Sequence, residues 1–380
     1  MEKYASVIRP EFAPGRRIIT VSDIHGNLPF FKGLLEKIRF STEDILVLDG
    51  DILEKGPESL ALLRYIMELE QHYTVYSLCG NLDELVLRFF QSDRMDGDFF
   101  PVYLPDHPES LLRQLAREGG FEQLEDLPRL RADLRAAYPE IWHWLEGLPI
   151  ILETEHLVFV HGGVSTLDHL EQEDRWHCMK NDDFIGQGHA FDKWVIVGHW
   201  PVTLYRDKIP SAAPIILRDR KICSIDGGCV LKLDGQLNAL ILPSEDSDDF
   251  TWEAYDGLPT AVALDDQEAS ADSVNVRWGR SDLDMLEPGD EVSLCRHRET
   301  GRELLILNSY LRNGPLNIYY KRGSGGLWCE DSTDYALPVK AGDRLTVVAA
   351  TKSHGTLCKK DGATGWYYGR LDREINHGER

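Results

Sequence analysis

Five short apolar runs, each followed within three residues by a polar side chain, constrain the fold of this chain more than any other feature. The runs are RIITVS, DILVLD, YTVYSL, HLVFV and KWVIV, and they lie between residues 17 and 242. They are short and rich in Val and Ile, as are strands buried on both faces of a sheet. Between the first three lie LPFFKGLLEKIRF and PESLALLRYIMELE, whose apolar residues recur at helical spacing. This alternation predicts a layered α/β domain.

Two later stretches depart from this alternation. Residues from about 85 to 146 are rich in Leu and Arg and predict a helical insertion, either a cap or plain packing scaffold. After Ser244, short alternating segments such as EVSLCRHR and RLTVVAAT predict antiparallel strands. EPGDEVSLCRHRETG and KAGDRLTVVAATKSHG look like two copies of one hairpin, and the second, with GATGWYYGRL, resembles an SH3-like barrel. We therefore predict a first domain over 1–245 and a β domain over 246–380, with one or two SH3-like barrels.

Charge and composition limit the partners. The formal net charge of −23 repels long polyanions, so stable binding to nucleic acid is not expected. A small phosphorylated substrate stays possible, because bound cations reverse the local sign. The sequence has no apolar stretch of bilayer length, no apolar signal segment at its start and no CxxC pair among its seven cysteines. We expect a cytoplasmic protein that binds no membrane.

The residues that follow the five runs are potential metal ligands: Asp23, His25, Asp51, Asn81, His161 and His199. In open α/β sheets, ligands gather at the carboxyl ends of the strands. Any one of these residues alone would more often be a cap or a surface group. Five strand ends that each supply a suitable atom predict a site for two divalent ions with Asp51 as the shared ligand. Carboxylates, an amide and imidazoles suit Mn best, with Fe or Zn as alternatives.

These segments resemble the calcineurin-like metallophosphoesterases, in particular the phosphoprotein phosphatase branch with its bacterial protein phosphatases and symmetrical diadenosine tetraphosphate hydrolases. The family motifs stand here as DIHGN (23–27), GDILEKG (50–56), GNLDE (80–84), HGG (161–163) and GHWP (198–201). The resemblance covers about 17–242 and implies an α/β (α+β) metallophosphatase sandwich. It also implies one ion on Asp23, His25 and Asp51, and the other on Asp51, Asn81, His161 and His199.

Two of the motifs differ from the pattern of this family, at three positions in all. The histidine that the family uses to protonate the leaving oxygen is Leu82 here, and the family's Asp-Arg pair is Glu54-Lys55. General acid assistance is worth about 10²–10⁴ in rate. Its loss predicts slow turnover or a preference for activated leaving groups, unless another acid substitutes. Lys55 can neutralise phosphate, but only as a point charge without the fork of an arginine.

Several further residues are candidates for site roles. The catalytic candidates are Asp51, Glu54 and Asp83, and the candidate substitutes for the missing acid also include Glu84, His107, His143 and His177. The candidates for binding substrate phosphate are Lys55, Asn81, Arg175 and Lys180. Supporting roles near the metals are expected for Asn27, Asp49 and Asp226. For most of these, the alternative is a helix cap or a solvated charge.

Three functions fit these observations. The first is a two-metal phosphoesterase that hydrolyses phosphomonoesters, most similar to a serine/threonine protein phosphatase acting on a phosphorylated protein or a small phosphorylated substrate. The second is a hydrolase of dinucleoside polyphosphates. The third is a weakly active, phosphate-binding scaffold protein. In any of them, the C-terminal β domain can bind a peptide or contact its own catalytic domain.

Overall fold

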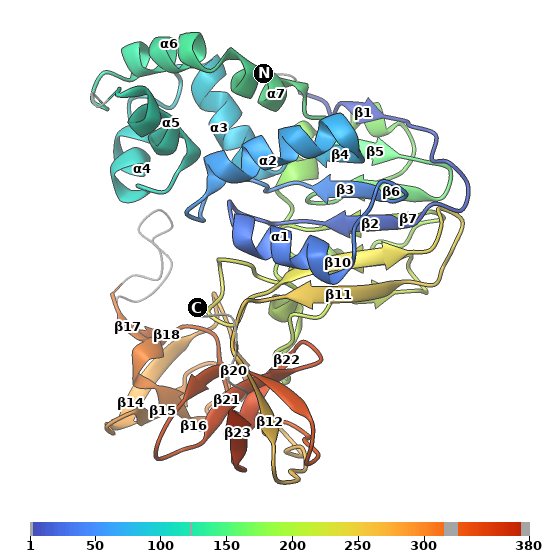
Figure 1. Ribbon diagram of the computed structural model, residues 1–380. Coiled ribbons are helices and arrows are strands. Elements are labelled where there is room, and N and C mark those ends of the chain that lie inside the picture. The colour runs from blue at the N-terminus through green and yellow to red at the C-terminus, as the bar shows by residue number, and fades with distance from the viewer. Residues whose placement is uncertain (1–2, 122–123, 315–325, 374–380) are drawn as a thin grey trace. The chain divides into compact units, whose positions relative to one another are not determined.

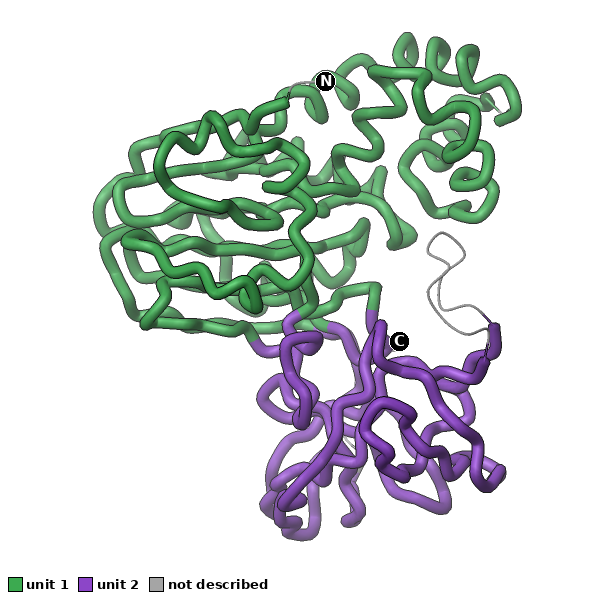
Figure 2. Tube along the Cα trace, turned by 180° about the vertical axis from the view of Figure 1, so that it is seen from behind, with its two compact units in different colours: residues 1–201, 214–231, 236–255 green, residues 202–213, 232–235, 256–380 purple. Residues whose placement is uncertain are grey.

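The computed structural model describes residues 3–121, 124–314 and 326–373, which fall into two units (Figure 2). Unit 1 comprises residues 1–201, 214–231 and 236–255, and unit 2 comprises residues 202–213, 232–235 and 256–380. The chain therefore passes between the units several times before it stays in unit 2. The domain boundary at 245 stays a prediction.

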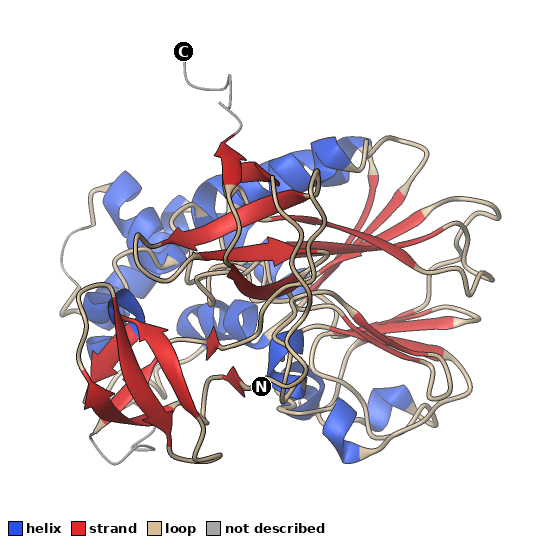
Figure 3. Cartoon of the chain, turned by 90° about the horizontal axis from the view of Figure 1, so that it is seen from below, coloured by secondary structure: helices blue, strands red, loops and turns tan. Residues whose placement is uncertain are grey.

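Unit 1 contains two mixed β-sheets (Figures 1 and 3). The five-stranded sheet has the order β11 (Thr251–Tyr255), β10 (Leu237–Leu242), β2 (Ile18–Val21), β3 (Ile45–Asp49) and β4 (Thr74–Leu78). The six-stranded sheet has the order β1 (Val7–Ile8), β5 (Ile151–Glu153), β6 (Leu157–Val160), β7 (Trp194–Val197), β9 (Ile222–Ser224) and β8 (Ile215–Leu217). The five apolar runs supply β2, β3, β4, β6 and β7, and within each sheet neighbouring strands of this set are parallel.

Alternate residues of these strands belong to two different apolar cores. Ile18 and Val47 pack with Phe159 and other side chains in a core to which both sheets contribute. Ile19 belongs instead to the core that the helices share. A strand with both faces buried needs apolar residues at every position, which is why the runs are continuous rather than alternating. The sandwich and its α/β class follow from this pattern.

The helices of unit 1 lie between its strands in the sequence. They are α1 (Leu28–Lys37), α2 (Ser59–His72), α3 (Asn81–Gln91), α4 (Phe100–Asp106), α5 (Leu111–Gly119), α6 (Leu127–Ala137), α7 (Pro139–Gly147) and α8 (Arg175–Met179), with 3-10 turns at Leu170–Gln172 and Ile185–Gln187. Helix α1 packs on β10 and β11, and α2 packs on β4 and α5. The stretch predicted as a helical insertion contains α4 to α7 and most of α3 (Figure 1). Among the described residues, no helix has the length and apolar character needed to cross a bilayer.

Unit 2 is formed mainly of antiparallel strands. One sheet has the order β22 (Ala363–Tyr367), β21 (Thr356–Lys360), β20 (Arg344–Ala350), β12 (Thr260–Ala263) and β23 (Leu371–Arg373). The other has the order β16 (Glu303–Leu307), β15 (Val292–His297), β14 (Asp282–Glu287), β18 (Leu327–Cys329) and β17 (Leu311–Asn313), and β13 (Asn275–Val276) pairs with β19 (Ser332–Thr333). Short 3-10 turns lie at Val202–Tyr205 and Asn308–Tyr310. The region is all-β, and its SH3-like character stays a prediction.

Candidate metal centre

The ends of the strands bring five of the six predicted ligands into two overlapping groups. Asp23, His25 and Asp51 form one group, and Asp51 with His161 and His199 forms the other. Within each group, one ligand atom from every residue lies within 4.8 Å of the others. Asp51 belongs to both groups, as a carboxylate that bridges two ions must.

The backbone at these positions is strained. Asp23, His25, Asp51 and His199 have φ angles of 55°, 52°, 46° and 65°, in the left-handed region that side chains other than glycine seldom adopt. Backbone hydrogen bonds hold the two loops in this shape, from the Asp23 amide to the Gly50 carbonyl and from the His25 amide to the Asp51 carbonyl (both 3.0 Å). Such strain persists only where the surroundings enforce it, and it is frequent at functional sites.

Gly80, the first residue of the GNLDE motif, lies against Asp51, and this close contact explains why the position is a glycine. A Cβ atom at this position would lie 2.1 Å from the backbone nitrogen of Asp51 and 2.2 Å from its Oδ1. No side chain can occupy that space. The absence of a side chain lets the loop before α3 approach the shared carboxylate, and the Leu82 amide donates to Asp51 Oδ1 at 2.8 Å.

Several buried ligand atoms meet no hydrogen-bond partner among the residues that the structure describes. They are Asp23 Oδ1, both ring nitrogens of His25, and His161 Nε2. His161 Nδ1 donates to the Asp49 carbonyl oxygen at 2.8 Å, which directs Nε2 at Asp51 Oδ1, 3.4 Å away. Buried polar atoms without partners are rare in folded proteins. Metal ions would satisfy all of these atoms, and the donor set fits such ions.

The pKa values of the ligand residues in the metal-free chain show the same need for positive charge beside the buried carboxylates. Burial alone would raise the pKa of Asp51, but the neighbouring His161 and His25 hold that pKa well below its usual range. Burial acts to lower the pKa of His161, yet the carboxylates of Asp51 and Asp23 outweigh it and raise that pKa to about 10. Burial lowers the pKa of His25 to about 4. The cluster of carboxylates thus holds a proton on His161 where cations would otherwise compensate the charge.

Asn81, the sixth predicted ligand, begins α3 beside His199. Its side-chain oxygen lies 2.9 Å from His199 Nδ1 and 3.3 Å from the Met179 carbonyl oxygen, so lone pairs face one another. Rotating the amide would turn this contact into a pair of hydrogen bonds. A cation bound by Asn81 and His199 would be the other way to stabilise it.

The three carboxylates considered as substitutes for the missing acid, Glu54, Asp83 and Glu84, all have partners of their own. Glu54 accepts hydrogen bonds from the Tyr103 hydroxyl and from the Leu111 amide (2.7 Å), and burial raises its pKa. Asp83 accepts from the backbone amides of Gly80 (2.9 Å), Leu53 (3.0 Å) and Ile52 (3.3 Å), and burial raises its pKa to about 7. Glu84 lies between Arg88 (3.2 Å) and Arg175 (2.9 Å). The half-buried Leu82 itself supplies no proton.

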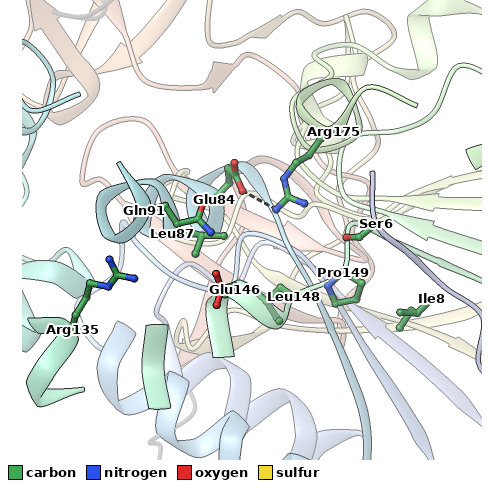
Figure 4. A pocket seen from close by; sticks show the side chains of 11 residues that line it. Ser6, Ile8, Glu84, Leu87, Gln91, Arg135, Glu146, Leu148, Pro149 and Arg175 are labelled. Atoms are coloured by element: carbon green, nitrogen blue, oxygen red, sulfur yellow. Dashed lines mark hydrogen bonds and ion pairs between the residues drawn. The ribbon is translucent and has the colours of Figure 1, made fainter. Parts of the chain in front are cut away.

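The positively charged side chains predicted to bind phosphate lie in two different parts of unit 1. Lys180 Nζ lies 3.3 Å from His199 Nε2, and the charge of Lys55 acts on His25, so both lysines are near the metal groups. Arg175 instead lines a pocket of about 680 Å³ together with Glu84, Leu87, Gln91 and residues of α6 and α7 (Figure 4). None of the six predicted ligands lines this pocket.

The remaining candidates lie outside both metal groups. The His107 ring stacks on Tyr103 with 4.2 Å between centroids, and the His143 ring lies 4.1 Å from that of Trp142. His177 Nε2 lies 3.1 Å from Asn181 Nδ2.

The three residues expected to support the site have defined contacts. Asn27 caps α1 by accepting from the Phe30 amide at 3.2 Å, and Asp226 accepts from the Gly228 amide at 2.7 Å. Asp49 is buried, and its backbone carbonyl accepts from His161.

Two residues near the site carried no sequence signal. Tyr103 reaches Glu54 from α4, and Asp182 Oδ1 lies 2.8 Å from His199 Nε2. Neither belongs to a motif, and both contacts depend on how distant segments pack. Only the folded arrangement reveals them.

Comparison with known proteins agrees with the motifs. The model of the calcineurin-like phosphoesterase family matches residues 16–225, more than half of the chain. The symmetrical bis(5'-nucleosyl)-tetraphosphatase of Vibrio parahaemolyticus is 34% identical over 178 residues, which are 46% of this chain and 54% of the relative. The protein of the same name from Shewanella sp. is 27% identical over 174 residues, 43% and 53% of the two chains. The chain thus spans about half the length of the curated relatives it matches.

Among solved structures, a protein serine/threonine phosphatase from Saccharomyces cerevisiae matches with a TM-score of 0.40 and 13% identity, over 68% of this chain and 85% of that one. The length of the family match, together with the two ligand groups around Asp51, is decisive: the chain belongs to the calcineurin-like phosphoesterase family.

Proposed function

We propose that this chain is a phosphoric ester hydrolase that holds two divalent ions, preferably Mn, and cleaves substrates with good leaving groups. Dinucleoside polyphosphates such as diadenosine tetraphosphate are the first candidates. The observation that carries the proposal is the position of Asp51 in both ligand groups. One shared carboxylate between two sets of ligands is the arrangement of a two-metal site.

The metal ions, when bound, lower the pKa of a shared water and neutralise the phosphoryl oxygens. Asp23 and His25 would hold one ion, Asn81, His161 and His199 the other, and Asp51 both. His161 is oriented for this role by its hydrogen bond to the Asp49 carbonyl, which leaves Nε2 free to bind. Asp83 keeps the loop of Asp51 in place through the amides of Ile52 and Leu53.

The surroundings of Leu82 favour an anhydride substrate. A phosphate or nucleotide leaving group departs without protonation far more readily than the alkoxide of a serine does. The carboxylates of Glu54, Asp83 and Glu84 are each held by other groups, which leaves them poorly placed to replace the missing histidine. The curated relatives named symmetrical bis(5'-nucleosyl)-tetraphosphatase support the same choice.

The lysine side chains near the metal groups are suited to bind a compact polyphosphate substrate. Lys55 and Lys180 lie near different predicted ligands, His25 and His199 respectively. Each is a flexible point charge that can contact phosphate oxygens without demanding one geometry. Phosphomonoesters with acidic leaving groups, such as aryl phosphates, are the second candidate, since they also need little help from an acid.

Three substrates separate the candidates in one experiment. The Mn-loaded protein is assayed on diadenosine tetraphosphate, an aryl phosphate and a phosphoserine peptide. We expect the highest kcat/KM on diadenosine tetraphosphate, a measurable rate on the aryl phosphate and the lowest on the peptide. A preference for the peptide would overturn the leaving-group argument. Silence on all three despite bound metal would favour a phosphate-binding scaffold protein.

A further inference from the structure

The two nitrogens of the His199 ring have different surroundings. Nδ1 lies 2.9 Å from the side-chain oxygen of Asn81, another predicted ligand. Nε2 points the other way, 2.8 Å from Asp182 Oδ1 and 3.3 Å from Lys180 Nζ. The ring therefore has one nitrogen on the metal side and one in a cluster of two charged side chains.

These neighbours compete to decide which nitrogen carries the proton. An ionised carboxylate only accepts hydrogen bonds, whereas an ammonium group only donates them. Asp182 therefore favours a proton on Nε2, and Lys180 acting alone would favour a proton on Nδ1, which would prevent that nitrogen from binding a metal. Asp182 is closer to the ring, and it also accepts from Lys180 at 2.7 Å, so its charge partly neutralises the lysine that would oppose it.

The segment that carries Asp182 is held in place by its neighbours. Asn181 is almost fully buried, and its side chain accepts from Gln187, which also donates to the backbone carbonyl of Asp182 at 3.2 Å. The position of the carboxylate is thus set by the loop, although about half of its side chain is exposed.

We infer that Asp182 is a positioning residue of the metal centre, which keeps the proton of His199 on Nε2 and leaves Nδ1 to bind the ion shared with Asn81. The inference rests on the proposed two-metal site. Residues that orient a histidine ligand in this way typically change metal affinity by about 10–100-fold when they are replaced. Lys180 then acts on the same proton indirectly, by neutralising Asp182.

Metal affinity tests this role without any substrate. Binding of Mn²⁺ to the metal-free full chain is measured by calorimetry for the wild type, Asp182→Ala and Asp183→Asn. The control removes the same charge from the next residue, whose left-handed backbone (φ 57°) suits asparagine. We expect one ion to bind about 10–100-fold more weakly to Asp182→Ala and the control to bind as the wild type does. Equal affinity in Asp182→Ala, or an equal loss in the control, would overturn the inference.

The protonation of His199 gives a second, independent reading. Nitrogen-15 NMR of the metal-free wild-type chain, at about pH 8 where the imidazole is neutral, distinguishes the two forms of the ring. We expect the proton on Nε2 in the wild type and a shift toward Nδ1 in Asp182→Ala, where Lys180 is the remaining charged neighbour of Nε2. A wild-type ring protonated on Nδ1 would overturn the inference even if the variant failed to fold. A chain that binds Mn²⁺ as predicted but hydrolyses nothing would refute the proposed function alone.

Discussion

Asp49, the last residue of β3, offers a sharp test of how charge is balanced beneath the metal centre. Its carboxylate is fully buried, and neither oxygen meets a hydrogen-bond partner among the described residues. Burial raises its pKa to about 7, although the charge of His161 acts in the opposite direction. Asp49→Asn keeps the shape and the backbone carbonyl that accepts from His161 at 2.8 Å, but it removes the charge.

The magnitude follows from the difference in pKa between the folded and unfolded states. The unfolded carboxyl titrates near 3.8, so the folded chain holds a proton that the unfolded chain releases between 3.8 and about 7. The free energy of unfolding therefore falls as the pH rises through this window. At about 1.4 kcal/mol per pH unit, this group destabilises the metal-free protein by roughly 4 kcal/mol above pH 7 and by about 1.5 kcal/mol at pH 5.

The assay is urea denaturation of the metal-free protein at pH 5 and at pH 8. The helical circular-dichroism signal reports on unit 1, because every α-helix of the described residues lies there. We expect Asp49→Asn to have a higher free energy of unfolding than the wild type. This excess should be about 2–3 kcal/mol larger at pH 8 than at pH 5. Added Mn²⁺ should reduce that excess, since cations favour the ionised carboxylate. A difference between variant and wild type that is the same at both pH values would refute the reasoning.

Two other substitutions test the surroundings of the missing acid. Leu82→His should raise kcat on an alkyl phosphate by about 10²–10⁴ and change the rate on diadenosine tetraphosphate much less; steady-state kinetics that show equal gains would contradict the leaving-group argument. Tyr103→Phe removes a donor to the buried carboxylate of Glu54 and should lower the free energy of unfolding by about 1–3 kcal/mol, measured by urea denaturation. Tyr4→Phe, at an exposed position, is its control, and an equal effect of the two would show that the contact with Glu54 contributes nothing.

The strands and the ligand groups could be predicted because their signals are local. Continuous Val and Ile runs need burial on both faces, and the structure provides it by packing Ile18 and Ile19 into different cores. The ligands follow the runs within three residues, so the chain delivers His161 and His199 to the same edge as soon as β6 and β7 pair in parallel. Neither step requires knowledge of distant contacts.

Contacts between distant segments could not be predicted in the same way. Glu54 replaces the aspartate of a family motif, and nothing in the sequence near it points to Tyr103, which donates to it from α4. Asp83 is a candidate for the missing acid in the sequence, but its oxygens accept from the amides of the Asp51 loop. Asp182 belongs to no motif, and its contact with His199 depends on the path of the chain after α8. Each of these partnerships arises from tertiary packing, which spacing along the sequence does not encode.

The central claim is that Asp51 bridges two metal ions, and the stoichiometry of Mn²⁺ binding tests it most directly. Calorimetric titration of the metal-free chain should show two ions per chain. His25→Ala should weaken one of them, whereas Asp51→Asn should weaken both, because Asp51 belongs to both ligand groups. A single ion in the wild type, or an Asp51→Asn variant that binds two ions with unchanged affinity, would contradict the account.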